Sequence, residues 1–280
     1  MNDLSRQSFL GIASDRVLSE AQVAIIGLCG GGSHVAQQLA HIGVERFFLC
    51  DPDRVEDSNL NRMVGASRSD AHAARPKVDV VSGRISAINP DARIAKAPKA
   101  WQGVAQQLRA STAVFGCVDS FSERSQLEAM CRRFLIPYID IGMDVAKSRT
   151  GYTISGQVIL SMPGYPCMRC LGFITDELLV AEAQQYGAAG GRPQVVWPNG
   201  VLASTAVGLF VSMLLPWHSE TELPLFLEYD GNAARVFHSN RLQAIAGMIC
   251  DHYAGLDDLG DPFYGRTDTQ QSAESLDHAS

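Results

Sequence analysis

The chain has 280 residues, with 23 Lys and Arg against 30 Asp and Glu, which gives a formal net charge of −7. Hydrophobic residues make up 46% and charged residues 19%, a balance typical of a soluble globular enzyme with one large or two small domains. The acidic balance argues against binding to nucleic acid or to an anionic membrane, because both need a basic face. Seven cysteines without a secretory signal favour reduced thiols and a cytoplasmic location over a disulfide framework.

One long apolar run, Val201–Leu215, needs its own explanation. It is shorter than the roughly 20 residues that a bilayer requires, and Pro216 and Trp217 close it. The pattern therefore predicts a helix buried in the core or in a subunit interface, not a membrane span.

Strands and helices alternate over the first half of the chain. Short apolar runs predict strands at 22–27, 46–51, 93–97, 113–118 and 137–142. Apolar residues at helical spacing predict helices at 35–42, 76–88, 102–109 and 122–134. Buried strands that alternate with helices are typical of a parallel sheet with right-handed crossovers. We therefore expect a doubly wound, mostly parallel α/β sheet of the Rossmann type over about residues 20–145.

The second half of the chain shows a different pattern. Residues 151–162 alternate between apolar and polar, as a half-exposed antiparallel strand does. The segments 225–229 and 235–238 flank Asp230-Gly231-Asn232, which predicts a hairpin. We expect these antiparallel strands to extend the sheet, so that residues 1–253 form one domain. The polar residues 254–280 are predicted to form a disordered tail.

A glycine-rich turn joins the first predicted strand to the first helix of the sheet. It reads Gly27-Leu28-Cys29-Gly30-Gly31-Gly32-Ser33, and Asp51 ends the next strand. Backbone N–H groups at such a turn approach a phosphate closely, and an acid at the second strand hydrogen-bonds a ribose. Cys29 stands where the G-x-G-x-x-G pattern has its middle glycine. The context still favours nucleotide binding over a tight turn without a ligand.

Further charged side chains fall at the same predicted edge of the sheet. A polar loop, 51–62, follows the second strand, Lys77 begins a helix, and Asp119 ends the fourth strand. A hydride-transfer enzyme, which also has the strand, glycine turn and helix, does not need Arg62, Lys77 and Asp119. An enzyme that transfers a phosphoryl or nucleotidyl group does need such side chains, because cations neutralise the charge of a triphosphate and an acid binds Mg²⁺.

These motifs resemble the ThiF/MoeB/HesA family of ubiquitin-activating-like adenylyltransferases. The resemblance runs from about Leu4 to Trp217, and its most specific mark is the string D-x-D-x-V-x-x-S-N-L-N-R at Asp51–Arg62. The other marks are the glycine turn, Ser5-Arg6-Gln7, Arg75-Pro76-Lys77, Ile88-Asn89-Pro90, Cys117-Val118-Asp119 and Pro166-Cys167-Met168-Arg169-Cys170.

The resemblance implies an enzyme that uses ATP to adenylate the C-terminal glycine carboxylate of a small ubiquitin-like or sulfur-carrier protein and releases pyrophosphate. It also implies that the enzyme is a homodimer. Arg6 matches an arginine that reaches the ATP of the other subunit, and Asp119 matches the Mg²⁺ ligand. Asp51 would hold the ribose, with Asp53 beside it. The residues that the resemblance places at the phosphates are Gly27, Gly30, Gly31, Gly32, Ser33, Asn59, Arg62 and Lys77.

Cys167 and Cys170 have the spacing of half a structural zinc site. In the family the second half is often another C-x-x-C, which this chain lacks, but Cys250 and His252 supply a thiol and an imidazole. A Cys₃His zinc site is favoured over the alternative, a relic of the site with Cys250 as a core thiol.

No cysteine lies between Leu171 and Ile249, where relatives that form a thioester carry one. We therefore expect the reaction to stop at the acyl-adenylate. Two further hypotheses stay open: the related tRNA-modifying dehydratase, which the acidic charge disfavours, and a non-catalytic scaffold for a ubiquitin-like partner, supported by Cys29 alone.

Overall fold

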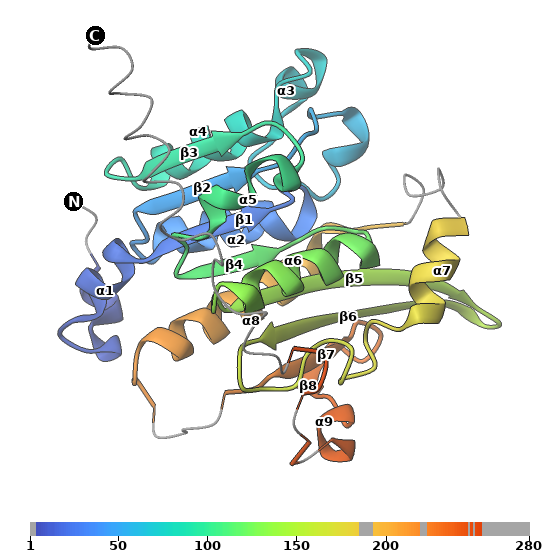
Figure 1. Cartoon of the computed structure of the whole chain (residues 1–280). Coiled ribbons are helices and arrows are strands. Elements are labelled where there is room, and N and C mark those ends of the chain that lie inside the picture. Colours follow the sequence, from blue (N-terminus) through green and yellow to red (C-terminus); the bar gives the residue numbers. More distant parts are fainter. Residues whose placement is uncertain (1–3, 185–192, 219–222, 246, 249, 254–280) are drawn as a thin grey trace, which may run out of the picture.

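The computed structural model describes residues 4–184, 193–218, 223–245, 247–248 and 250–253 (Figure 1). These residues form one sheet of eight strands in the order β3-β2-β1-β4-β5-β6-β7-β8. The strands are β1 (Gln22–Ile26), β2 (Arg46–Cys50), β3 (Arg93–Ala97), β4 (Ala113–Gly116), β5 (Tyr138–Ser148), β6 (Gly151–Ser161), β7 (Phe226–Asp230) and β8 (Arg235–His238). The first five strands are parallel and the last three join antiparallel, which confirms the predicted fold class.

Helices cover both faces of the sheet (Figure 1). The α-helices are α1 (Ser14–Glu20), α2 (Gly30–His41), α3 (Arg68–His72), α4 (Lys77–Ile88), α5 (Ala105–Leu108), α6 (Phe121–Arg133), α7 (Asp176–Gln184), α8 (Val196–Leu214) and α9 (Arg241–Ala244). Three 3₁₀ turns are also described: η1 (Ser5–Leu10), η2 (Asp57–Asn59) and η3 (Trp101–Val104). One apolar cluster packs α2, α4 and α8 on one face, and a second packs α5 and α6 on the other.

Strand β5 is longer than the predicted strand 137–142. It pairs with β4 only through Tyr138, Ile139 and Asp140, and then continues to Ser148. All eleven of its residues pair with β6 in an antiparallel hairpin. The second half of β5 is largely exposed and polar, so it lacks the apolar run by which the buried half was recognised.

Helix α8 begins at Val196, five residues before the predicted start at Val201. Trp197 and Pro198 lie in its first turn, where proline is tolerated because the N–H it lacks would have no partner inside the helix. With 19 residues and a mean hydropathy of 1.3, α8 is long and apolar enough to cross a membrane. Half of it is buried against α2, β5 and β6, however, and this packing accounts for the buried half of its apolar residues.

Two glycines bring α2 unusually close to the sheet. A Cβ added to Gly32 would lie 1.9 Å from the carbonyl oxygen of Gly27. Gly27 itself has a φ of +85°, and a Cβ there would lie 2.4 Å from the Cys117 oxygen. The turn between β1 and α2 therefore excludes a side chain at both positions.

The substitution Gly32→Ala should lower the free energy of unfolding by about 2 kcal/mol or more, because α2 must move away from Gly27. Gly83→Ala is the matched control within a helix. A Cβ at Gly83 meets nothing within 4 Å, so alanine there should raise the free energy of unfolding by about 0.5–1 kcal/mol. Urea denaturation measures both values, and similar effects of the two substitutions would contradict the close contact.

Candidate active site

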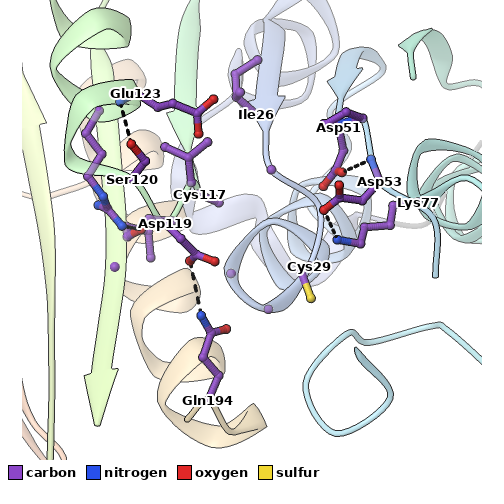
Figure 2. A pocket seen from close by; sticks show the side chains of 18 of the residues that line it. Ile26, Cys29, Asp51, Asp53, Lys77, Cys117, Asp119, Ser120, Glu123 and Gln194 are labelled. Atoms are coloured by element: carbon purple, nitrogen blue, oxygen red, sulfur yellow. Dashed lines mark hydrogen bonds and ion pairs between the residues drawn. The ribbon is translucent and has the colours of Figure 1, made fainter. Parts of the chain in front are cut away.

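A cavity of about 1040 Å³ lies where β1, β2 and β4 end (Figure 2). Nine of the predicted site residues line it: Gly27, Gly30, Gly31, Asp51, Asp53, Asn59, Arg62, Lys77 and Asp119. Gly32, Ser33 and Arg6 lie outside this lining. The volume is at the upper end of the range that small-molecule sites occupy in proteins.

The N-terminus of α2 opens into the cavity without a capping side chain. Cys29 is its N-cap residue and makes no side-chain cap hydrogen bond, so the first N–H groups of the helix are available to an anion. In Figure 2 the Cys29 thiol lies on the Lys77 side of the cavity. Burial raises the pKa of this thiol, against the opposing influence of Lys77 and Arg62, so Cys29 adds no negative charge.

Ser33 does not line the cavity but holds two of the segments around it together. Its hydroxyl donates to the Gly30 carbonyl oxygen at 3.1 Å and accepts from the Val64 N–H at 3.1 Å. These two bonds tie α2 to the loop that carries Arg62. Gly32 also shapes the cavity indirectly, because its close contact with Gly27 positions the start of α2.

Asp51 is fixed by backbone N–H groups of the turn after β1 and of its own loop after β2. One carboxylate oxygen accepts from the Leu28 N–H at 2.7 Å and the other from the Asp53 N–H at 2.8 Å. Each oxygen keeps a second lone pair for a ligand. Burial raises the pKa of Asp51, while Lys77 and the two amides act in the opposite direction.

Lys77 is a buried cation at the start of α4. Its ammonium group lies 2.8 Å from a carboxylate oxygen of Asp53, and its side chain is 7% exposed against 63% for Asp53. Burial alone lowers the pKa of a lysine, but Asp51 and Asp53 outweigh it and raise the pKa of Lys77. The ammonium group is therefore charged, and its exposed partner can yield to a stronger anion.

Asn59 and Arg62 belong to one folded loop. The Asn59 side chain accepts from the Glu56 N–H at 3.1 Å and so shapes η2. One Nη of Arg62 donates to the Ser58 carbonyl oxygen at 2.6 Å and to the Asn61 side chain at 3.0 Å. The Arg62 Nε is buried without a partner among the described residues. An oxygen ligand would satisfy this donor.

Asp119 lies on the opposite wall, just before α6. Its carboxylate accepts a hydrogen bond from the Gln194 amide at 3.3 Å, and Figure 2 shows the two side chains pointing toward each other. Gln194 in turn uses its backbone oxygen to accept from Asn61 at 2.9 Å. The segment before α8 therefore links both walls, a role that no sequence motif indicated.

No sequence motif indicated Glu182 of α7 either. Its carboxylate accepts from the N–H groups of Phe121 and Ser122, both at 2.9 Å, and from the Ser120 hydroxyl at 3.1 Å. The N-terminus of α6 is therefore already occupied by a negative charge. No side chain of α7 is fully buried, so this contact and the ion pair between Arg169 and Asp176 are polar anchors of the helix.

A second cluster brings together the four predicted metal ligands. The sulfurs of Cys167 and Cys170 are 3.6 Å apart, and the His252 Nδ1 lies 3.5 Å and 3.4 Å from them. With the sulfur of Cys250, all four donor atoms lie within 4.8 Å of one another. Three thiols and an imidazole at this spacing suit a tetrahedral Zn²⁺.

Arg6 is exposed in η1 and lies outside the cavity of its own chain. Large apolar side chains surround this segment on the surface: Phe9 is 66% exposed, and Ile12 and Trp217 are also exposed. The rings of Phe9 and Trp217 meet edge to face, with centroids 6.0 Å apart.

Comparison with known proteins identifies the family. A family model described as the ThiF family matches residues 3–246. The chain belongs to the ThiF family. The sulfur carrier protein ThiS adenylyltransferase of Escherichia coli is 33% identical over 174 residues, which are 60% of this chain and 65% of that protein. The tRNA threonylcarbamoyladenosine dehydratase of E. coli is 31% identical over 151 residues, which are 51% of this chain and 56% of that protein.

The ThiF-family chain therefore matches less than two thirds of the length of these two relatives. The crystal structure of E. coli MccB with ATP superposes with a TM-score of 0.70 over 86% of this chain and 72% of that chain. Its sequence identity is 20%, so this likeness shows the shared fold.

Loss of the Glu182 carboxylate should loosen both helices that it joins. In Glu182→Ala, hydrogen exchange in α7 and in the first turn of α6 should be about fivefold faster, which corresponds to roughly 1 kcal/mol for a lost cap. Glu177→Ala removes the same charge from α7 without touching α6. Exchange in α6 that is equally fast in both variants would contradict the contact.

Proposed function

We propose that this ThiF-family protein is an ATP-dependent adenylyltransferase that activates the C-terminal glycine carboxylate of a small ubiquitin-like or sulfur-carrier protein. The observation that carries the proposal is the composition of one cavity. An uncapped helix N-terminus, Lys77 and Arg62 meet Asp119 there. Family membership and the relative that acts on a sulfur carrier support the same reaction.

The proposed reaction depends on electrostatic stabilisation of the phosphates and does not require a general base. A carboxylate is already ionised at neutral pH, and its oxygen forms a bond to the α-phosphorus of ATP while the bond to the bridging oxygen breaks and pyrophosphate leaves. The barrier comes from bringing one anion up to another. In this chain Lys77, Arg62 and the N–H groups of α2 would lower that barrier, and Asp51 would orient the nucleotide through its ribose.

Asp119 fits Mg²⁺, which takes oxygen ligands and keeps several waters. Its exposed carboxylate faces the cavity opposite Lys77 (Figure 2). A bound Mg²⁺ would neutralise part of the negative charge on the phosphates. Asp53 would exchange its contact with Lys77 for a position beside the nucleotide.

The proposed assembly is a homodimer in which Arg6 acts on the ATP of the partner subunit. Two observations support it. Arg6 does not line the cavity of its own chain, and the exposed side chains Phe9, Ile12 and Trp217 lie on or near the segment that carries it. Exposed apolar side chains of this size are typical of an interface.

Thioester formation is not part of the proposal. Cys50 and Cys117 line the cavity, but burial raises the pKa of Cys50 to about 12 and raises that of Cys117 further. Both therefore stay protonated and weakly nucleophilic. The acyl-adenylate would be passed to an acceptor on another protein.

Asp119→Ala and Arg62→Ala should each reduce ATP–pyrophosphate exchange by about 100-fold or more, because each removes charge compensation at the phosphates. The assay uses ThiS and other small proteins that end in glycine as substrates. Lys96→Ala is the control, since Lys96 forms an exposed ion pair with Asp79. Exchange that survives both cavity substitutions would contradict the proposal, as would exchange that does not depend on a protein substrate.

The same assay separates the alternatives. A tRNA-modifying dehydratase would consume ATP in the presence of tRNA and show no exchange with a protein that ends in glycine. A non-catalytic scaffold would bind such a protein without exchange. The acidic composition disfavours the first, and the available N-terminus of α2 disfavours the second.

We further propose that Cys167, Cys170, Cys250 and His252 hold a structural Zn²⁺, which would fasten the C-terminal segment to the turn after β6. Elemental analysis of the purified chain should find about one zinc per chain. The double variant Cys167→Ser/Cys250→Ser should lose it and unfold at a lower temperature, whereas Cys29→Ser should keep it. A metal-free wild-type chain of unchanged stability would contradict this site.

A further inference from the structure

The nucleotide cavity has two chemically different ends (Figure 2). One end has the uncapped N-terminus of α2 together with Lys77 and Arg62. At the other end the N-terminus of α6 is already bound to Glu182. A triphosphate is attracted to the first end, and at the second it meets fixed negative charge and amides that are already in use. The phosphates of the proposed substrate therefore lie at α2, and its base points toward α6.

The α6 end has walls suited to a flat ring. Ile26, Cys50 and Trp101 line the cavity and belong to the apolar cluster that packs α6, and Val118 packs against this cluster. Asp51, the proposed ribose residue, directly follows Cys50 and so lies between the two ends. A nucleotide held at its ribose by Asp51 would place its base among these side chains.

Glu123 is the acidic side chain of this end that is directed toward the base walls. It belongs to the first turn of α6, and Figure 2 shows its carboxylate pointing toward Ile26, whereas Asp119 points away toward Gln194. Burial raises the pKa of Glu123, a hydrogen bond from the Gln102 side chain lowers it, and the charges of Asp119, Glu182 and Asp51 raise it. The Glu123 carboxylate has Gln102 as a partner and keeps lone pairs for a ligand, whereas the Glu182 carboxylate accepts from two amides and a hydroxyl at the start of α6.

We propose that Glu123 selects the nucleobase by accepting a hydrogen bond from its exocyclic amino group, so that the protein prefers adenosine triphosphate to inosine triphosphate. A carboxylate offers only acceptors. Adenine presents an N–H donor at its 6-amino group, and hypoxanthine presents a carbonyl oxygen at the same position. An acceptor facing that oxygen leaves both groups unsatisfied in a partly buried site. This inference rests on the proposed function and adds the residue that sets base specificity.

The test compares the dissociation constants of ATP and ITP by calorimetry for the wild type, Glu123→Gln and Glu123→Ala. The wild type should bind ATP at least about tenfold more tightly than ITP. Glutamine can both donate and accept, so Glu123→Gln should lower this ratio by about tenfold. Glu123→Ala, which has no polar group to contribute, should lower it as well and covers the case in which the glutamine variant fails to fold.

Glu182→Gln is the matched control, because it removes the same charge from the same cavity and keeps an amide oxygen that can still accept from the N-terminus of α6. It should change the binding of ATP and ITP by similar factors and leave their ratio intact. A ratio that is unchanged in the Glu123 variants, with ATP binding retained, would overturn base selection and leave the proposed function standing. A wild-type protein that binds neither nucleotide would overturn the proposed function itself.

Discussion

The close approach of α2 to the turn after β1 is the constraint on which the cavity depends. Gly32 lies so near the Gly27 carbonyl oxygen that no side chain fits between them, and this brings the first N–H groups of α2 to the edge of the sheet. The Leu28 N–H is then held by Asp51 from β2. Cys29 lies outside these contacts and directs its side chain into the cavity, which explains how the fold accepts a residue larger than glycine there.

Several charged groups of the cavity are paired with one another or with the backbone before any ligand enters. Asp51 accepts from two amides, Lys77 pairs with Asp53, and Glu182 binds the N-terminus of α6. Such pairing offsets the cost of burying charge and fixes the side chains in place. The pairing is uneven, since α2 keeps its amides available and α6 does not. Together with Lys77 and Arg62 at the α2 end, this difference gives the cavity a direction in which a nucleotide would fit.

The sequence predicts the parallel strands well because each is a short, buried apolar run between helices. It also predicts which cysteines and histidine cluster, because Cys167 and Cys170 have the spacing of a metal-binding pair, and the structure brings Cys250 and His252 to them. It does not predict Glu182, whose contact with Phe121 joins residues 61 positions apart in the chain. The sequence does not indicate Glu123 either, because glutamate is common in the first turn of a helix and only the structure shows the cavity around it.

The cysteine and histidine cluster joins points 82 residues apart, from Cys170 to His252. The chain between them includes α7, α8, β7 and β8, which are one wall of the cavity and the far end of the sheet. Fastening so large a loop removes many conformations from the unfolded chain, worth about 4–5 kcal/mol for a covalent link of this length. With a metal bound, the stability of the antiparallel end of the sheet would therefore depend in part on the availability of that ion.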